Sequence, residues 1–259
     1  MTSPIVLEYG RYRPELGADP SFAASSAVIG RVRTGARLLL GPYATIRADG
    51  EHIRIGSDCS FAEGSTLHIV DSILPCIVGD RVTVGRHALV HACTVEDGCV
   101  IGDGAVVMDG ARVAAGALIS AGSMVSPRKQ LEGGWLYAGS PARPVRRIDS
   151  EELEVARRAV LRGEGFDLVN SDRLPLPQMT AYRRRAAGPG PLVGLAGQQP
   201  QVASSAYVAP TAIVAGDVRI GADASIWFAN VVWAEGASIS IGERTNIQDK
   251  SLLEAGPGR

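Results

Sequence analysis

One arginine and two histidines occupy equivalent places in the sequence, and their side chains could support metal chemistry. Arg47, His68 and His91 each directly follow a large aliphatic residue. Zinc binds histidine nitrogens at about 2.0–2.1 Å, so two imidazoles share an ion only when the fold brings them side by side. The surrounding sequence must therefore stack segments that are distant along the chain.

Aliphatic residues recur every six positions around these three side chains. Each is followed three positions later by glycine and four positions later by a small residue over the most regular stretch. Neither the 3.6-residue period of a helix nor the alternation of an ordinary strand produces this spacing. The ladder runs from Leu16 to Val125, with extra residues after Ile46 and near 73–77 and one residue fewer just after Val90.

This ladder resembles the hexapeptide-repeat family of left-handed parallel β-helices, in which three hexads form one triangular coil. The resemblance implies an all-β fold with six stacked coils between Leu16 and Val125. Residues one coil apart lie above one another at about the 4.8 Å spacing of neighbouring strands. We therefore predict that Arg47, His68 and His91 form one outward-facing column.

The sequence divides into four predicted segments. Residues 1–148 form the β-helix, 149–163 an amphipathic helix with Asp149 or Ser150 as its cap, and 164–201 a linker. Residues 202–259 form a second, partial β-helix, because the ladder of the first module returns there at a constant offset. This repetition predicts an internal duplication.

Composition narrows the possible partners. The net charge is −1 and no long basic run occurs, so neither nucleic acid nor an anionic membrane is expected. The N-terminal sequence lacks a signal-peptide pattern and no run of 18 apolar residues occurs, which favours a cytoplasmic protein. The four cysteines show no CxxC pattern and are predicted to be reduced core thiols: Cys59, Cys76, Cys93 and Cys99.

Several segments are similar to the gamma-class carbonic anhydrases: IRADG at 46–50, GSTLH at 64–68, the stretch 77–111, and WLYAGSPARPVRRI at 135–148. The resemblance implies a homotrimer with zinc at each subunit interface, held by two histidines of one subunit and one of its neighbour. His68 and His91 match the two ligands from one subunit, and Arg47 and Asp49 match a conserved Arg-x-Asp pair. The implied reaction is hydration of carbon dioxide to bicarbonate by zinc-activated water.

The third ligand departs from the family pattern. Arg86 stands where the family has histidine, and His87, one residue further on, is the candidate replacement. Ala62 replaces a glutamine that positions the catalytic water, and Glu63 replaces an aspartate. The predicted catalytic residues are Arg47, Asp49 and Glu63, and the predicted metal ligands are His68, His91 and His87.

Three functions remain open at this stage. The chain could be a weakly active carbonic anhydrase, or a non-catalytic trimeric scaffold in which Arg86 fills the metal's space and pairs with Glu63 or Asp49. It could also be a hexapeptide-repeat acyltransferase that binds coenzyme A between subunits and uses one histidine as base.

The second module has Trp233 and Glu254 in place of the column's arginine and histidine, although Gln248 and Asp249 are kept. The remaining histidine, His52, is predicted to be a solvated turn residue.

Overall fold

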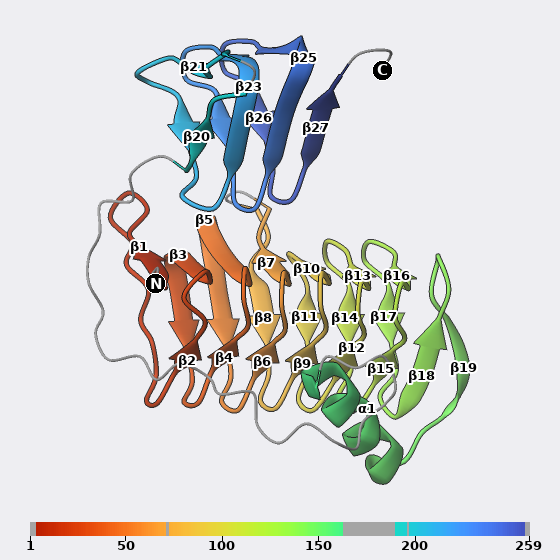
Figure 1. Ribbon diagram of the computed structural model, residues 1–259. Coiled ribbons are helices and arrows are strands. Elements are labelled where there is room, and N and C mark those ends of the chain that lie inside the picture. Colours follow the sequence, from red (N-terminus) through yellow and green to blue (C-terminus); the bar gives the residue numbers. More distant parts are fainter. Residues whose placement is uncertain (1–3, 71–72, 163–189, 196, 257–259) are drawn as a thin grey trace. The chain divides into compact units, whose positions relative to one another are not determined.

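The chain forms two compact units, Met1–Arg184 and Arg185–Arg259, each built from parallel strands. The computed structural model describes residues 4–70, 73–162, 190–195 and 197–256. The first unit is a left-handed parallel β-helix whose coils follow one another in chain order, from red to green in Figure 1. The predicted fold class is confirmed.

Short strands form the walls of the first unit. Two longer strands, β3 and β5, turn a corner and take part in two walls, with a register shift between Gly30 and Val32 that absorbs the extra residues after Ile46. The strands are β1 (Ile5–Leu7), β2 (Ser21–Phe22), β3 (Ala27–Thr34), β4 (Leu39–Leu40), β5 (Thr45–Ile55), β6 (Ser60–Phe61), β7 (Thr66–His68), β8 (Cys76–Val78), β9 (Thr83–Val84), β10 (Leu89–His91), β11 (Thr94–Val95), β12 (Val100–Ile101), β13 (Val106–Val107), β14 (Arg112–Val113), β15 (Leu118–Ile119), β16 (Met124–Val125), β17 (Gln130–Leu131), β18 (Trp135–Ala138) and β19 (Arg143–Arg147).

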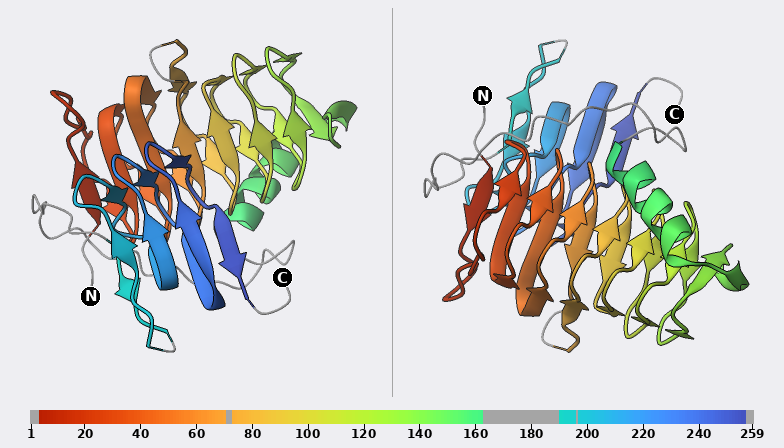
Figure 2. Two further views of the ribbon diagram at one scale, coloured as in Figure 1. Left: turned by 90° about the horizontal axis from the view of Figure 1, so that it is seen from above. Right: turned by 90° about the horizontal axis from the view of Figure 1, so that it is seen from below.

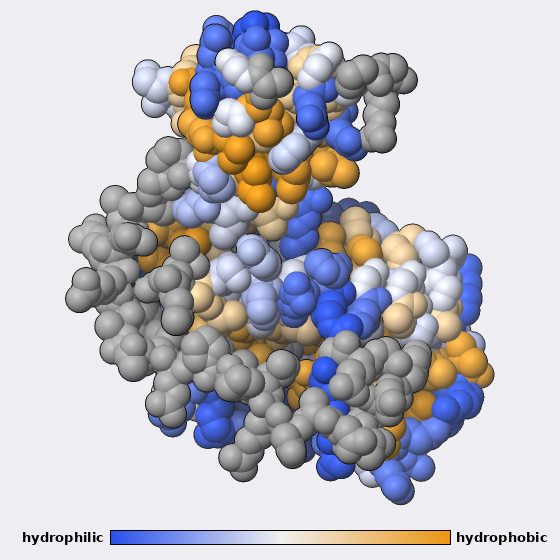
Figure 3. Space-filling view, in the orientation of Figure 1, coloured by the Kyte–Doolittle hydropathy of each residue, from blue (hydrophilic) through white to orange (hydrophobic). Residues whose placement is uncertain are grey.

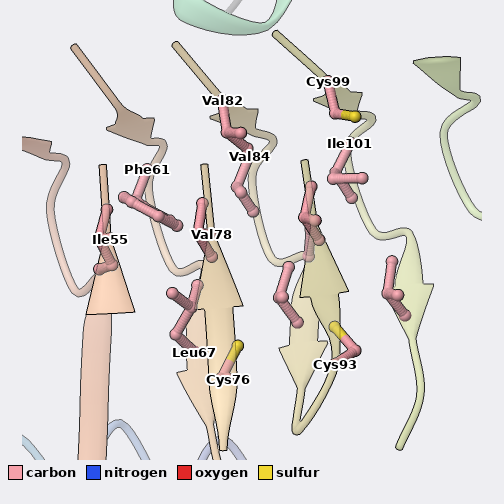
Figure 4. Packing of buried hydrophobic residues seen from close by; sticks show 14 of the residues in the cluster. Ile55, Phe61, Leu67, Cys76, Val78, Val82, Val84, Cys93, Cys99 and Ile101 are labelled. Atoms are coloured by element: carbon pink, nitrogen blue, oxygen red, sulfur yellow. The ribbon is translucent and has the colours of Figure 1, made fainter. Parts of the chain in front are cut away.

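The aliphatic ladder points inward and forms one continuous core. Figure 4 shows Ile55, Phe61 and Leu67 of one coil beside Val78 and Val84 of the next, all of them buried. All four cysteines are free and buried, as predicted. Many outward positions carry polar residues, but some carry apolar ones. The visible face of this unit therefore mixes hydrophilic and hydrophobic side chains (Figure 3).

The coil stack extends beyond the predicted end at Val125. Leu131 and Tyr137 continue the six-residue ladder, are buried, and pair through β17 and β18 with the preceding coil. The antiparallel strand β19 then returns along β18. The six coils predicted up to Val125 were too few, because that count relied on small residues and glycines at the corners, whereas the inward aliphatic position alone maintains the stack. Leu131 and Tyr137 still lie within the predicted β-helix segment 1–148.

One helix follows, α1 (Ser150–Arg162), close to the predicted 149–163. Asp149 caps it: its carboxylate accepts the backbone N–H of Glu152, whose carboxylate accepts the N–H of Asp149. Arg157 fastens the helix to the β-helix by donating hydrogen bonds to the carbonyls of Arg81 and Gly98. Figure 2 shows α1 lying across the strands of one wall. Among the described residues, no helix combines the length and apolar character needed to cross a bilayer.

The second unit repeats the elements of the first at a constant spacing. Ile213–Ile220 and Val231–Ile241 begin 186 residues after β3 and β5 (213 − 27 and 231 − 45), with the same register shift after the glycine. Part of the predicted linker 164–201 lies outside the described residues, but its last part is already strand. The strands are β20 (Leu192–Val193), β21 (Gln201–Val202), β22 (Tyr207–Val208), β23 (Ile213–Ile220), β24 (Ser225–Ile226), β25 (Val231–Ile241), β26 (Asn246–Ile247) and β27 (Leu252–Ala255).

Candidate metal centre

The strand register confirms the predicted column of polar residues. Arg47 pairs with His68 across β5 and β7, and His68 pairs with His91 across β7 and β10. The two imidazole rings lie with centroids 5.1 Å apart. Nδ1 of His68 and Nε2 of His91 are 3.2 Å apart, so one nitrogen of each ring faces the other ring.

The second nitrogen of each imidazole is bound by a carboxylate. Nε2 of His68 lies 3.1 Å from Oδ1 of Asp49, and Nδ1 of His91 is hydrogen-bonded to Asp109. Since ionised carboxylates only accept hydrogen bonds, these ring nitrogens carry the protons. In neutral rings the two nitrogens that face each other, Nδ1 of His68 and Nε2 of His91, then keep their lone pairs, so both are available to one cation.

Arg47 pairs with the first of these carboxylates, Asp49. Its side chain is only 1% exposed and forms an ion pair with Asp49. Burial would raise the pKa of Asp49, but the hydrogen bond from His68 and the charge of Arg47 outweigh it, so this pKa lies below its ordinary value. Asp49 is therefore an anion that orients His68.

His68 and His91 fit two positions of a zinc site. Tetrahedral ligands at about 2.0–2.1 Å from zinc lie about 3.3 Å from each other, close to the observed nitrogen separation. Carboxylates that hold the far nitrogen are the usual outer partners of zinc-binding histidines. Within the described part of the chain, however, no cluster of three His, Cys, Asp or Glu side chains could hold a metal ion. The described residues of one chain thus provide two candidate histidine ligands and no third.

Arg86 lies at the corner after β9, in the position matched to the family's third histidine. Its guanidinium forms an ion pair with Asp103 at 3.2 Å, and its backbone N–H donates to the same carboxylate. Within one chain, Arg86 thus pairs with Asp103 of the next coil and not with Glu63 or Asp49. A pairing with Glu63 or Asp49 of a neighbouring subunit stays a prediction.

His87 and Glu63 lie apart from the two histidines within one chain. His87 adopts a left-handed backbone conformation and is exposed, and its ring covers Gly64 so closely that a Cβ there would clash. Glu63 is also exposed; its carbonyl accepts the N–H of His87, and its carboxylate forms no hydrogen bond or ion pair with any described residue. A ligand role for His87 and a catalytic role for Glu63 remain predictions about a neighbouring subunit.

The equivalent column of the second unit contains no imidazole. Trp233 pairs in register with Glu254, where the first unit has Arg47 and His68. All four histidines of the chain precede residue 92. The second unit therefore contributes no histidine to a metal centre.

Sequence reasoning missed Asp109 and Asp103. Both lie on the coil after the residue they bind, and Asp109 directly follows Met108, the next position in the column of His91. Extending the column by one coil would have placed Asp109 near His91. Their hydrogen bonds depend on side-chain direction, which the repeat does not encode.

The stacked hexads define a hexapeptide-repeat β-helix protein. A solved hexapeptide transferase family protein from Anaplasma phagocytophilum is 24% identical and has the same fold, with a TM-score of 0.54 over 61% of this chain and 93% of that one. A Bacillus cereus protein assigned as an acetyltransferase is 26% identical, with a TM-score of 0.54 over 64% of this chain and 96% of that one. No protein-family model matches the chain.

The sequence relatives define the family more narrowly. Protein YrdA of Escherichia coli is 36% identical over 156 residues, which cover 58% of this chain and 85% of YrdA. A probable carbonic anhydrase of Methanocaldococcus jannaschii is 36% identical over 140 residues, covering 54% of this chain and 87% of the relative. The chain belongs to the gamma carbonic anhydrase-like family.

Proposed function

We propose that the chain is a gamma carbonic anhydrase-like homotrimer whose interfacial zinc site is incomplete, so that hydration of carbon dioxide is weak or absent. His68 and His91 supply two ligands, and the neighbouring subunit presents Arg86 in place of the third. The proposal makes the protein a weakly metal-binding relative of the carbonate dehydratases, with carbon dioxide or bicarbonate as substrate only if a metal is retained.

The proposal of an incomplete zinc site rests mainly on the position of Arg86. An arginine side chain cannot ligate zinc, because it stays protonated and has no acceptor nitrogen. Its positive charge also opposes a divalent cation nearby. The carboxylate of Asp103 accepts hydrogen bonds from both the guanidinium and the backbone N–H of Arg86, so the arginine is a fixed part of the corner.

The trimer is supported by where the polar groups lie. His68 and His91 are the last residues of β7 and β10, whereas Arg86 is at the corner after β9. A threefold arrangement can bring these two positions of neighbouring subunits together, while one chain alone keeps them apart.

Stopped-flow hydration of carbon dioxide tests the proposal. We expect the purified protein, with zinc added, to be at least about 100-fold slower than an active gamma carbonic anhydrase measured in parallel, because only two ligands hold the metal. His68→Ala should change this residual rate little. A fast rate that His68→Ala abolishes would contradict the proposal.

A second candidate, acyl transfer, rests on the Bacillus cereus protein assigned as an acetyltransferase, which this chain resembles at 26% identity. Because a ligand that binds only the folded state raises its thermal stability, coenzyme A is the discriminating probe. We expect no shift in melting temperature with millimolar coenzyme A. A concentration-dependent rise of several degrees would favour the transferase.

A further inference from the structure

A basic hollow lies on the first unit, at the end of the coil stack that holds the N-terminus. It has a volume of about 470 Å³, within the range of small-molecule sites, and is formed by residues 11–15, 31–33 and 52–54. Its cationic lining consists of Arg11, Arg13, Arg31, Arg33, Arg54 and His52. None of these residues belongs to the candidate metal centre.

The coil geometry itself gathers these charges. Val32 of β3 and Ile53 of β5 are buried and pair in register, so their sequence neighbours point outward. Arg33 then pairs with Arg54 on the adjacent strand, and Glu15 pairs with Arg33 on the other side. The hollow thus spans three successive layers, each displaced by about 4.8 Å from the next.

Nearby carboxylates neutralise only part of this charge. Glu15 binds Arg33 at 2.6 Å, Glu51 lies 4.0 Å from Arg31 and 2.8 Å from the His52 ring, and Glu8 lies 4.0 Å from Arg13. Five guanidiniums therefore face three carboxylates. Arg54, which is exposed, forms no hydrogen bond or ion pair with any described residue, and Arg11 binds no carboxylate among them.

Tyr12 lies within the resulting positive field, between Arg11 and Arg31. Its hydroxyl accepts a hydrogen bond from Arg11 at 3.2 Å, and the guanidinium of Arg31 lies 5.1 Å from the centre of its ring. The hydrogen bond and charge of Arg11 lower the pKa of this phenol. The same field favours any anion that enters the hollow.

We propose that this hollow binds a small diphosphate anion, free or as an ester. Guanidiniums bind phosphate oxygens bidentately, which makes arginine the preferred residue for such groups. Arg11 and Arg54 both line the hollow, and neither has a carboxylate partner among the described residues. A diphosphate carries two anionic groups, so each can pair with one of these guanidiniums, whereas a single phosphate offers only one.

Isothermal titration of the full chain with inorganic pyrophosphate, in buffer of about 0.15 M ionic strength without divalent cations, tests the proposal. We expect saturable binding at about one site per chain, and weaker binding of orthophosphate. Arg54→Gln should weaken pyrophosphate binding at least about tenfold, since each lost contact is a charge-assisted hydrogen bond. Arg11→Gln provides a second variant at the opposite side of the hollow.

Arg128→Gln is the matched control, because Arg128 is an exposed arginine of the same unit that lies outside the hollow. It should leave pyrophosphate affinity unchanged. Tighter binding of a nucleoside diphosphate than of pyrophosphate would identify the ligand as an ester, and equal or weaker binding would identify the free anion. Absence of saturable binding, an equal loss with Arg128→Gln, or orthophosphate binding as tightly as pyrophosphate would overturn the proposal.

Discussion

Arg86→His is expected to raise bound zinc from well below one ion to about one ion per chain. The substitution removes a fixed positive charge and adds a neutral nitrogen donor, and both changes favour a divalent cation. His68 and His91 already lie with two nitrogens 3.2 Å apart and carboxylates on their far sides. Zinc content would be measured by mass spectrometry after gel filtration.

Three further variants separate the effect of the charge from that of the added imidazole. Arg86→Gln removes the charge without supplying an imidazole, so zinc should rise only slightly. Adding His91→Ala to Arg86→His should abolish the gain, whereas adding His87→Ala should matter little, because the His87 ring covers Gly64. If Arg86→His binds no more zinc than the unmodified protein, the assignment of the column as a metal centre is wrong.

Ile119→Ala is expected to lower the free energy of unfolding of the first unit by about 2–5 kcal/mol. Ile119 is 0% exposed and lies in the core between Ile101 and Tyr137 of the adjacent coils, so truncation leaves a cavity. Ile73→Ala is the matched control, since that side chain is 71% exposed and should cost less than about 0.5 kcal/mol. Urea unfolding followed by circular dichroism measures both; equal losses would contradict the stacked core.

The fold and the column could be predicted because a fixed repeat converts sequence distance into spatial position. Once each coil is three hexads, the residue after Ile46 must lie beneath the residue after Leu67, and the interruptions only need to be subtracted. The end of the stack was placed too early because Arg128 and Lys129 occupy corner positions where earlier coils have glycine and a small residue. Arg128 adopts the left-handed conformation that glycine adopts elsewhere, so the corner forms without it.

The partners at the corners could not be predicted in the same way. Whether Arg86 binds Asp103, Glu63 or Asp49 depends on the direction of a long side chain, and the repeat fixes only the backbone. The carboxylates of Asp103 and Asp109 decide the electrostatics of the centre, yet neither belongs to the inward ladder. A ligand supplied by a neighbouring subunit is, in addition, a property of the assembly and not of one coil.

The zinc content of the unmodified protein tests the central claim most directly. After incubation with excess zinc and removal of free metal, the protein should retain well below one ion per chain, because two imidazoles alone bind zinc weakly and Arg86 opposes it. His87→Ala should leave that amount unchanged. One tightly bound zinc per chain that is lost on His87→Ala would contradict the account, since the third ligand would then be His87 and the site complete.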